Sequence, residues 1–458
     1  MSEQRQKIQL KLAFAEESRS EAPIVSQEGT KSFTAERKAE SPAIVERLME
    51  EVCERRNCEQ ALKRVRSNKG SAGVGRMTVQ QLPAYLKKHW PNIREQLLAG
   101  TYKPQPVLRV EIPKPDGGVR KLGIPTVVDR FIQQAVLQIL QQRWDPTFSD
   151  HSYGFRPGRS AHQAITQAQQ YIAEGNGVVV DIDWEKFFDK VNHDRLMAAL
   201  AKRIADKRML KLIRAFLNAG VMENGLVSAV DEGTPQGGPL SPLLSNIVLD
   251  ELDRELERRG HRFVRYADDC NIYVRSYRAG DRVMESISHF ITKKLKLKVN
   301  SEKSAVARPM VRKFLGFSFT SGRSARRRLA PKAIHRFKQR VRELTRRTRG
   351  VKIETMVAQL APYLRGWKNY FGYCQTPSVL EALEHWYRRR LRSVLWKQWK
   401  QGSVRFAELR KRGVGRDLAA QTAGSVHGPW RLADSPALHI ALPNTFFDSL
   451  GLPRLIVR

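Results

Sequence analysis

Two short strand-like runs that end in acidic side chains constrain the fold of this chain more than any other feature. GVVVDID at 177–183 is a valine-rich run after a glycine turn, which is typical of a buried strand, and it places Asp181 and Asp183 on one face. HRFVRYADDCNIYVRS has strand character on both sides of Asp268 and Asp269, so it predicts a tight hairpin with two carboxylates at its tip. In an arbitrary chain such a pair would indicate only a turn.

The charge balance indicates a polyanionic partner. The 458 residues include 81 Lys and Arg against 46 Asp and Glu, a formal net charge of +35. Such an excess destabilises the compact state by self-repulsion unless a polyanion is usually bound, and nucleic acid is the default partner for a chain of this kind. Acidic strand ends in so basic a chain therefore indicate a specific role.

The chemistry of paired carboxylates suggests what that role is. Two acidic strand ends that face one another would repel strongly unless divalent cations bridge them. Mg²⁺ prefers hard oxygen ligands from a few aspartates, completed by water and substrate phosphates. Two such ions about 4 Å apart can activate an attacking hydroxyl and stabilise the leaving oxygen of a phosphoryl transfer. The sequence therefore predicts two Mg²⁺ ions as cofactors and nucleotidyl transfer as the reaction.

Composition divides the chain into four predicted segments. Residues 1–40 are polar without periodicity and predict a flexible leader. Residues 41–320 intersperse strand-like and helical runs, which predicts an α/β (α+β) core. Residues 321–400 predict basic amphipathic helices, and residues 401–458 form a C-terminal extension with apolar content and loop signals but no recognisable catalytic motif.

The region after residue 320 is strongly basic. The stretch 322–350 holds twelve Lys or Arg against one Glu, with apolar residues at helical spacing, and two further helices are predicted after it. A single basic helix would favour a solvated charged face. Three in a row with aromatic residues among them favour nucleic-acid binding, because arginines contact phosphates and aromatic rings stack on bases. The candidate RNA-binding residues are Arg346, Arg347, Arg349, Arg365 and Lys368.

The sequence carries no sign of membrane insertion or secretion. No apolar run approaches the roughly 20 residues that span a bilayer, and residues 1–20 lack the apolar core of a secretion signal. The 4 cysteines form no Cys-x-x-Cys pair, which argues against a disulfide framework or a zinc module. We therefore expect a cytoplasmic protein without a membrane partner, associated with the nucleoid when bound to DNA.

An ordered series of motifs resembles the reverse transcriptases encoded by bacterial group II introns. YADD at 266–269 looks like the signature of these enzymes, and the resemblance extends from roughly residue 44 to the C-terminus. Each motif alone is modest evidence, but the whole set in the family's order is highly specific. Besides the acidic strand, the other motifs are IPKPDGGVRKLGIPTVVDRFIQQAV (112–136), HSYGFRPGRSAHQAI (151–165), GTPQGGPLSPLLSNIVLDELD (233–253), KVNSEKS (298–304), KFLGFSF (313–319) and LAPYLRGWKNYFGYC (360–374).

The resemblance implies catalytic and metal-binding roles for three aspartates. In the family one metal ligand stands five residues before the second aromatic of a phenylalanine pair, which here is Phe188. This assigns the role to Asp183 and leaves Asp181 as the alternative. Asp268 would be the second main ligand, with Asp269 as its partner.

Other roles are implied by position within the same motifs. Lys114 and Arg120 match the basic residues that hold the incoming triphosphate, where fixed cations neutralise charge that develops in the transition state. Phe188 matches the aromatic gate that favours deoxynucleotides, because its ring would clash with a 2′-hydroxyl. Gln236 matches a residue that lines the nucleotide pocket. Lys303 matches a lysine that assists as a general acid near pyrophosphate.

The resemblance also implies a fold and a function. The fold is a right-hand polymerase, with fingers and an antiparallel-sheet palm within 41–320, followed by an α-helical thumb and maturase region within 321–400. The function is that of an RNA-directed DNA polymerase that binds its intron RNA to assist splicing and supports intron mobility by target-primed reverse transcription. Its partners would be intron RNA, an RNA template with a DNA primer, dNTPs and a DNA target.

The chain departs from the family pattern in two places. Gly75 and Arg76 stand where relatives commonly carry Asp and then Gly, which puts the template-side loop in doubt. The extension at 401–458 supplies none of the metal-ligand cysteine pairs of the HNH nuclease that many relatives carry, so we expect no such nuclease.

Two other functions stay open on the sequence alone. The first is an RNA chaperone or maturase that keeps the polymerase fold but uses only its binding surface. The complete carboxylates, with Lys114, Arg120 and Gln236, argue against it, because clustered acids repel RNA. The second is a reverse transcriptase recruited to host defence or repair, which the YADD core does not exclude but the maturase-like region disfavours.

Overall fold

The structure, a computed structural model, describes most of the chain after residue 46. The described residues are 47–113, 119–185, 187–223, 226–228, 233, 237–322 and 324–456, without the side chains of Arg120 and Asp189. The predicted leader (1–40), Lys114 and Gln236 lie outside the described residues. Ile44–Arg458 is one unit, to which every element below belongs. No described helix has the length and apolar character needed to cross a bilayer.

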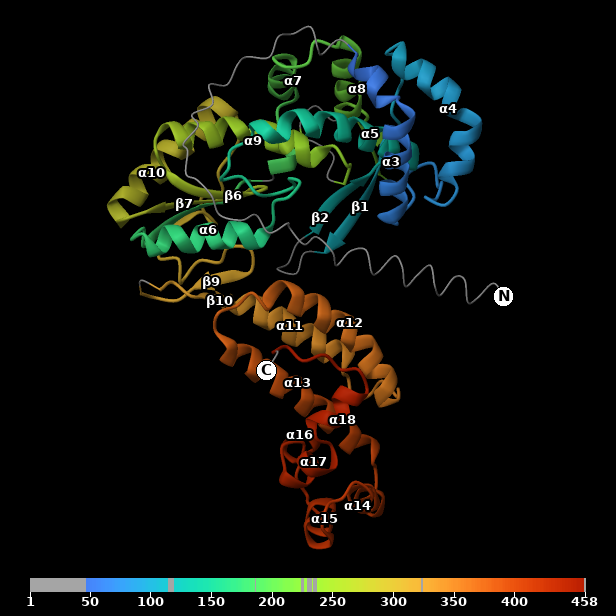
Figure 1. Cartoon of the computed structure of the whole chain (residues 1–458), viewed down its shortest axis with the longest axis vertical. Helices are drawn as coiled ribbons and strands as arrows, with labels where there is room; N and C mark the ends of the chain where they lie inside the picture. Colours follow the sequence, from blue (N-terminus) through green and yellow to red (C-terminus); the bar gives the residue numbers. More distant parts are fainter. Residues whose placement is uncertain are drawn as a thin grey trace, which may run out of the picture. The chain divides into compact units, whose positions relative to one another are not determined.

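A four-stranded antiparallel sheet, the palm sheet, carries the acidic strands. Its strands and the helices that cover it are β3 Val178–Ile182, β6 Arg262–Tyr266, β7 Asp269–Val274, β8 Ala305–Ala307, α6 Ala161–Ala173, α9 Ser241–Arg258 and α10 Tyr277–Phe290. The strand order is β6-β7-β3-β8. Val178 and Val180 belong to the core formed with α9 and α10, whereas Val179 packs with α6, because successive strand residues point to opposite faces. Figure 1 shows α6 on one side of this sheet and α9 and α10 on the other.

The palm sheet confirms the predicted strand and hairpin. β3 pairs with β7 from Val178↔Val274 to Ile182↔Cys270. Asp183 follows β3 directly, so this register brings it to the end of the sheet where the β6–β7 hairpin turns. The mixed α/β core with an antiparallel palm, followed by a helical region, is the predicted fold class.

A second sheet has the strand order β2-β1-β4-β5. Its strands and the helices that precede them are α2 Leu48–Val52, α3 Arg55–Ser67, α4 Leu82–Leu98, β1 Val107–Pro113, β2 Val119–Ile124, β4 Val221–Glu223 and β5 Leu226–Ser228. β1 pairs antiparallel with β2 and parallel with β4. This mixed sheet lies within residues 41–320, which we predicted to form the fingers and the palm together.

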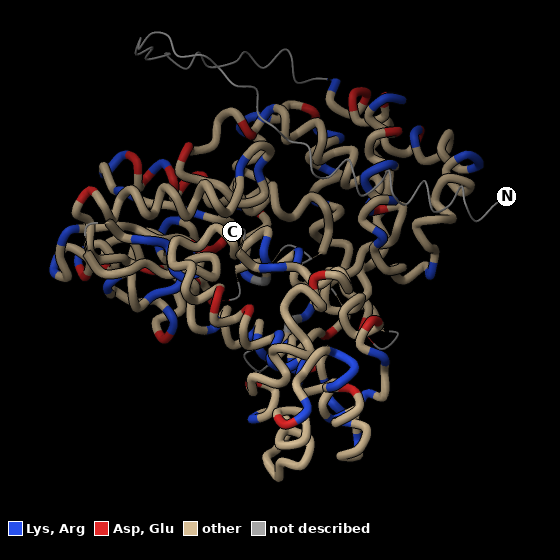
Figure 2. Tube along the Cα trace, turned by 60° about the horizontal axis from the view of Figure 1, so that its bottom comes forward, with Lys and Arg blue, Asp and Glu red and all other residues tan. Residues whose placement is uncertain are grey.

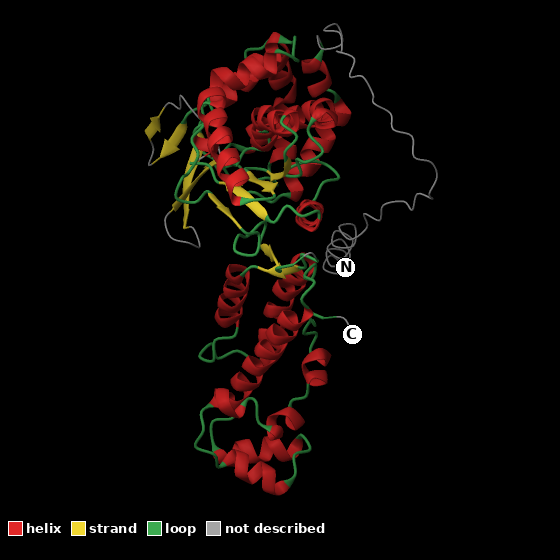
Figure 3. Ribbon diagram, turned by 90° about the vertical axis from the view of Figure 1, so that its left-hand side faces the viewer, coloured by secondary structure: helices red, strands yellow, loops and turns green. Residues whose placement is uncertain are grey.

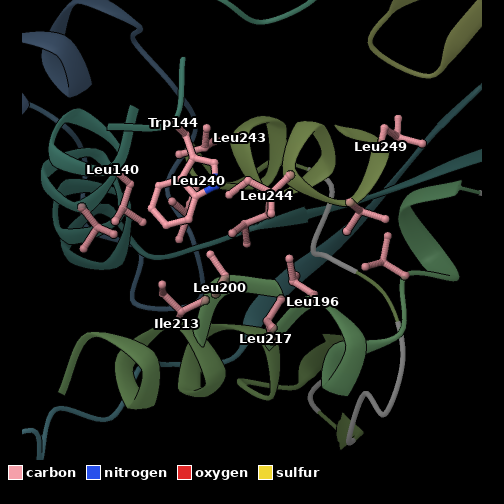
Figure 4. Packing of buried hydrophobic residues seen from close by; sticks show 14 of the residues in the cluster. Leu140, Trp144, Leu196, Leu200, Ile213, Leu217, Leu240, Leu243, Leu244 and Leu249 are labelled. Carbon is pink, nitrogen blue, oxygen red and sulfur yellow. The ribbon is translucent and has the colours of Figure 1, made fainter. Parts of the chain in front are cut away.

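A large apolar core joins the helices α9 and α10 of the palm sheet to the helices that precede the second sheet. Elements that build it with α9 are α5 Val127–Trp144, η4 Phe187–Asp189, α7 His193–Ala201, α8 Lys207–Leu217 and η5 Ile291–Leu295. The short turn η3 Asp145–Thr147, which follows α5, buries none of its residues. Figure 4 shows side chains of α5, α7, α8 and α9 meeting in this core. Leu196 and Leu200 are four residues apart and therefore share one face of α7. α7 ends at Ala201, and Ile204 is buried from the segment that follows it.

Among the described residues after the palm sheet, a small hairpin is followed by a series of helices (Figure 3). Its first elements are β9 Phe317–Phe319, β10 Arg327–Leu329, α11 Pro331–Leu344, α12 Ile353–Phe371 and α13 Pro377–Gln398. These three helices confirm the helical spacing predicted from the sequence. Phe337 of α11 is fully buried and its ring centroid lies 4.5 Å from that of Trp367 of α12, so several aromatic residues of this region belong to its core.

The C-terminal extension is helical rather than loop-rich. Its elements are α14 Gly402–Lys411, α15 Arg416–Ala423, α16 Pro429–Leu432, α17 Pro436–Ala441 and α18 Asn444–Ser449. Its apolar side chains share one core with α13. The final segment returns to α13, where Tyr387 Oη donates to the Pro453 carbonyl oxygen at 2.6 Å and Leu455 N donates to Glu384 Oε2 at 2.8 Å. The residues on both sides of the domain boundary that we expect near residue 400 therefore belong to one core.

Leu249→Ala should destabilise the core of Figure 4. Leu249 is 0% exposed, and truncation of a fully buried leucine leaves a cavity that costs about 2–5 kcal/mol. Denaturant unfolding of parent and variant measures the change. Val311→Ala, at a position that is 74% exposed, is the control and should change the free energy of unfolding by less than about 0.5 kcal/mol. Equal effects of the two substitutions would contradict the placement of Leu249 in the core.

Candidate active site

The turn that joins β6 to β7 holds the paired aspartates. Tyr266 pairs with Asp269 across the hairpin, which leaves Ala267 and Asp268 as the two turn residues. Ala267 has a φ of +56°, a left-handed conformation that costs a residue with a Cβ about 1–3 kcal/mol. The surrounding structure must therefore hold this turn in its conformation.

Gly154 lies directly against the turn. A Cβ at this position would collide with the backbone nitrogen of Ala267, so only glycine permits the approach. The same segment is tied to β6, because Tyr153 N donates to the Arg265 carbonyl oxygen at 2.9 Å. Asn246 Nδ2 of α9 donates to the Gly154 carbonyl oxygen at 2.9 Å. Two backbone segments and a side chain of α9 thus meet at the turn.

The guanidinium of Arg265 fixes the turn from inside the protein. Arg265 is 0% exposed, yet each of its five N–H groups has an acceptor. It donates to both carboxylate oxygens of Asp253 at 2.7 and 2.5 Å, to Asn246 Oδ1 and the Ala267 carbonyl oxygen at 2.9 Å each, and to Ser152 Oγ at 2.7 Å. Burial lowers the pKa of Arg265, but the Asp253 carboxylate outweighs this and raises it above its ordinary value. The Asp253 carboxylate therefore balances the buried charge of Arg265. The hydrogen bond to the Ala267 carbonyl oxygen holds that residue in its left-handed conformation.

Asp183 is held beside this turn by its backbone and by its neighbour. Asp183 N donates to Ser304 Oγ at 3.0 Å, and Asn300 N donates to the Asp183 carbonyl oxygen at 2.8 Å. The indole Nε1 of Trp184 donates to the Asp268 carbonyl oxygen at 2.5 Å. The 300–304 loop and the Trp184 ring therefore bring the end of β3 to the tip of the hairpin.

The predicted carboxylates meet at one place. Asp183 and Asp268 line a single cavity of about 1070 Å³. The Asp269 side chain reaches solvent, but protein atoms surround its carboxyl group. This partial burial, followed by repulsion from Asp268, Asp181 and Asp183, raises the pKa of Asp269 to about 7. Carboxylates this close disfavour one another's charge, and hard oxygen donors gathered in this way fit divalent cations such as Mg²⁺.

Asp181 shares a face of β3 with Asp183 but has a different partner. Arg312 Nε donates to Asp181 Oδ2 at 2.8 Å, and Arg312 Nη2 donates to the Lys303 carbonyl oxygen at 2.6 Å. Burial raises the pKa of Asp181, and Arg312 opposes this rise. Arg312 therefore compensates the charge of Asp181 and links β3 to the 300–304 loop. This arrangement favours Asp183 as the metal ligand, an assignment that stays a prediction.

Two further predicted residues line the same cavity. Phe188 packs edge-on against buried Phe187, with ring centroids 5.2 Å apart at 80°, so the orientation of its ring is restricted. Lys303 N donates to the Asn300 carbonyl oxygen at 3.3 Å, which closes a turn in the 300–304 loop and leaves the lysine at the cavity wall. Both residues thus line the cavity that Asp183 and Asp268 also line, while their catalytic roles stay predictions.

The predicted triphosphate and nucleotide contacts are only partly described. Arg120 belongs to β2, but its side chain is not described, and Lys114 and Gln236 lie outside the described residues. Gly237, the neighbour of Gln236, lines the cavity and has a φ of +128°, a conformation that side chains rarely adopt. A Cβ at Gly237 would lie against the carbonyl oxygen of Gly123, so glycine permits a close approach of backbone here.

Sequence reasoning missed two basic side chains of the cavity, Lys121 and Arg130. Arg130 Nη2 donates to the Ser71 carbonyl oxygen, whereas Arg130 Nε is buried and has no hydrogen-bond partner among the described residues. Burial lowers the pKa of Arg130. Lys121 directly follows predicted Arg120, which was its only signal. Arg130 lies within the motif at 112–136, but nothing in that motif distinguished this arginine from the other residues of α5.

The predicted RNA-binding residues lie in two places. Arg346 and Arg347 are exposed in the loop between α11 and α12. Arg349 donates to the Leu344 carbonyl oxygen and to Gln359 Oε1, both at 2.6 Å, so it braces that loop. On α12, Arg365 is exposed and Lys368 is partly buried. The side chains of Arg346, Arg347 and Arg365 are therefore the ones most available to a ligand.

A basic cluster around Trp386 of α13 was not predicted. Lys338 and Arg342 of α11 lie 5.7 and 5.6 Å from the Trp386 ring centroid, and Arg390 of α13 lies at 5.4 Å. Burial, followed by repulsion from Arg342 and Arg347, lowers the pKa of Arg390. The signal was available, because residues four apart share a helix face and both 338/342 and 386/390 have that spacing. Figure 2 shows Lys and Arg spread over the described chain, so this cluster is distinguished by its aromatic centre.

Comparison with known proteins identifies the family. Residues 112–319 match the family model for reverse transcriptase (RNA-dependent DNA polymerase), and residues 334–413 match that for the group II intron maturase-specific domain. Protein YkfC of Escherichia coli K12 is 32% identical over 324 residues, which cover 62% of this chain and 84% of YkfC. The chain belongs to the group II intron reverse transcriptase/maturase family. This confirms the resemblance inferred from the motifs.

Other comparisons show how far the likeness reaches. The group II intron-encoded protein LtrA of Lactococcus lactis is 31% identical over 330 residues, which cover 58% of this chain and 55% of LtrA. This member of the group II intron reverse transcriptase/maturase family thus matches about half the length of LtrA. A chain of a solved structure titled partial Cas6-RT-Cas1–Cas2 complex is 23% identical with a TM-score of 0.36, and the match covers 54% of this chain and 43% of that one.

Arg265→Ala should strongly destabilise this family member. The substitution leaves the Asp253 carboxylate buried without its partner, which costs about 3–5 kcal/mol. Removing both charges with Arg265→Met and Asp253→Leu together should cost less than Arg265→Ala alone. Thermal unfolding of the parent, Arg265→Met, Asp253→Leu and the double variant measures this cycle. Strictly additive losses would contradict the buried pair as described.

Proposed function

We propose that this protein is an RNA-directed DNA polymerase of a group II intron that also binds intron RNA to assist splicing. The observation that carries the proposal is that Asp183 and Asp268 line one cavity with basic side chains. Asp269 lies close enough for both of these carboxylates to raise its pKa. A surface that served only to bind RNA would gain nothing from clustered carboxylates, because they repel phosphate. The family matches at 112–319 and 334–413 support the two halves of this function.

The three aspartates would hold two Mg²⁺ ions, which would activate the primer 3′-hydroxyl and stabilise the leaving pyrophosphate. Phe188, with its ring restricted by Phe187, would lie under the sugar and exclude a 2′-hydroxyl. Lys114 and Arg120 would neutralise the triphosphate, and Gln236 would line the nucleotide pocket. Lys303 would donate a proton to the leaving pyrophosphate.

The partners in this proposal are nucleic acids and nucleotides. The polymerase would extend a DNA primer on an RNA template with dNTPs, and the primer in intron mobility would come from a cleaved DNA target. The helical region would contact intron RNA through Arg346, Arg347 and the basic cluster around Trp386, because RNA of complex shape is recognised largely through backbone and stacking. The protein would act in the cytoplasm, on nucleoid DNA.

Asp268→Ala should remove DNA synthesis while leaving RNA affinity nearly unchanged. The substitution deletes a carboxylate of the proposed metal site, and we expect a loss of at least about 10³-fold in rate, equivalent to about 4 kcal/mol of transition-state stabilisation. Extension of a DNA primer on an RNA template in Mg²⁺ measures the rate, and filter binding measures RNA affinity.

Asp281→Ala is the matched control for that experiment. Asp281 is an exposed aspartate of α10, so the control loses the same charge away from the cavity and should retain the parent rate. Synthesis by Asp268→Ala at the control rate would refute the metal-site assignment. Tight RNA binding by a parent protein that makes no DNA would instead favour a maturase that uses only its binding surface.

Neutralising Arg346, Arg347 and Arg349 together with glutamine should weaken RNA binding and flatten its salt dependence. Each lost phosphate contact lowers the slope of log K against log salt by about 0.7–0.9, and we expect Arg349 to contribute least because it braces the loop. Binding measured over a salt series gives the slope. The control, Arg275, Arg278 and Arg282 changed to glutamine, removes the same charge from exposed positions at α10. An unchanged slope in the first variant would place the RNA elsewhere.

A further inference from the structure

A second group of potential metal ligands lies in the C-terminal helices, far in sequence from the palm aspartates. His385 of α13, Asp434 after α16 and His439 of α17 direct their ligand atoms at one another. The Nε2 atoms of His385 and His439 lie 3.3 and 3.2 Å from the same oxygen, Asp434 Oδ1. The two imidazole rings are close to parallel, at 12°, with centroids 6.2 Å apart. All three side chains also reach solvent.

These distances match the geometry of ligands around one ion. Zn²⁺ binds imidazole nitrogen at about 2.0–2.1 Å and carboxylate oxygen at about 2.0–2.2 Å, which places neighbouring ligands of a tetrahedral site about 3.3–3.5 Å apart. Two imidazoles that both point at one carboxylate oxygen therefore need little movement to admit an ion between them.

The carboxylate is oriented by a partner of its own. Arg389 Nη1 lies 3.0 Å from Asp434 Oδ2, the oxygen that does not face the histidines. The Arg389 guanidinium lies 4.4 Å from the Trp430 ring centroid, and its Nε and Nη2 atoms donate to the Trp430 carbonyl oxygen at 3.1 and 3.0 Å. A metal-binding carboxylate is usually held in this way by an outer hydrogen bond. Arg389 thus fixes Asp434 with Oδ1 turned toward His385 and His439.

We propose that His385, Asp434 and His439 form a binding site for a transition-metal ion of the Zn²⁺ type, with the remaining coordination position open to water. Two nitrogen ligands and one oxygen suit Zn²⁺, whereas the all-oxygen donors Asp183, Asp268 and Asp269 suit Mg²⁺. The ion links α17 and the segment after α16 to α13. Its role is to fasten the C-terminal helices to the helix with which they share a core.

The competing account is that these side chains form only a hydrogen-bonded pair of histidines on an aspartate. Exposed ion pairs of that kind contribute about 0–1 kcal/mol and have no need of a metal. The two accounts differ in what they predict for Zn²⁺, so metal binding decides between them without reference to DNA synthesis.

The experiment is calorimetric titration of the full-length protein with Zn²⁺ in excess Mg²⁺, which keeps the carboxylates of the palm occupied. We expect one site that His439→Ala and Asp434→Asn each weaken by at least about 10-fold, since even changes outside the ligands cost 10–100-fold. His427→Ala is the control, because His427 is an exposed histidine of the same region outside the ligand group. It should bind Zn²⁺ as the parent does.

Two further readouts keep the proposal testable. Zn²⁺ should raise the midpoint of thermal unfolding of the parent and of His427→Ala but not of His439→Ala. Co²⁺ bound in place of Zn²⁺ should give visible absorption bands that His385→Ala abolishes. This second variant tests the site even if His439→Ala fails to fold. Equal Zn²⁺ affinity in the parent, His439→Ala and Asp434→Asn would overturn the proposal and leave the hydrogen-bonded pair.

Discussion

The buried ion pair between Arg265 and Asp253 is the contact on which the active-site end of this protein depends. It joins β6 to α9, and through Ser152 it joins both to the segment that precedes α6. The same guanidinium donates to the Ala267 carbonyl oxygen and so holds Ala267 in a left-handed conformation that alanine disfavours. Burial of the Arg265 charge costs free energy unless every N–H donor has an acceptor. The network therefore stabilises the turn only when all of its hydrogen bonds are made.

The alternation of the palm strands then decides which acids meet. Asp181 and Asp183 point to the same face of β3, and the register with β7 brings that face to Asp269. Arg312 neutralises Asp181, whereas Asp183 and Asp268 line the cavity together. One strand therefore carries two carboxylates with separate tasks, one in joining the sheet to a loop and one in the proposed chemistry.

Features that depend on neighbours in sequence were predictable, and those that depend on distant partners were not. The β3 strand, the hairpin and helices α11 to α13 follow from local periodicity, so the aspartates could be placed at strand ends. Arg265 looked like any charged residue of a half-exposed strand, because its partners at 152, 246 and 253 are remote in sequence. The C-terminal helices escaped prediction for a similar reason: each is short, and its apolar residues are buried against α13 and against the other C-terminal helices.

The return of the final segment to α13 has a consequence for how the protein is made. Leu452 and Leu455 are buried, and the backbone around them bonds to Tyr387 and Glu384 of α13. During synthesis α13 leaves the ribosome well before these residues, so its apolar face stays incomplete until the chain has been extended to Leu455. The palm sheet can close earlier, because all its strands precede α11. The fold of the helical region is therefore completed later in synthesis than that of the palm sheet.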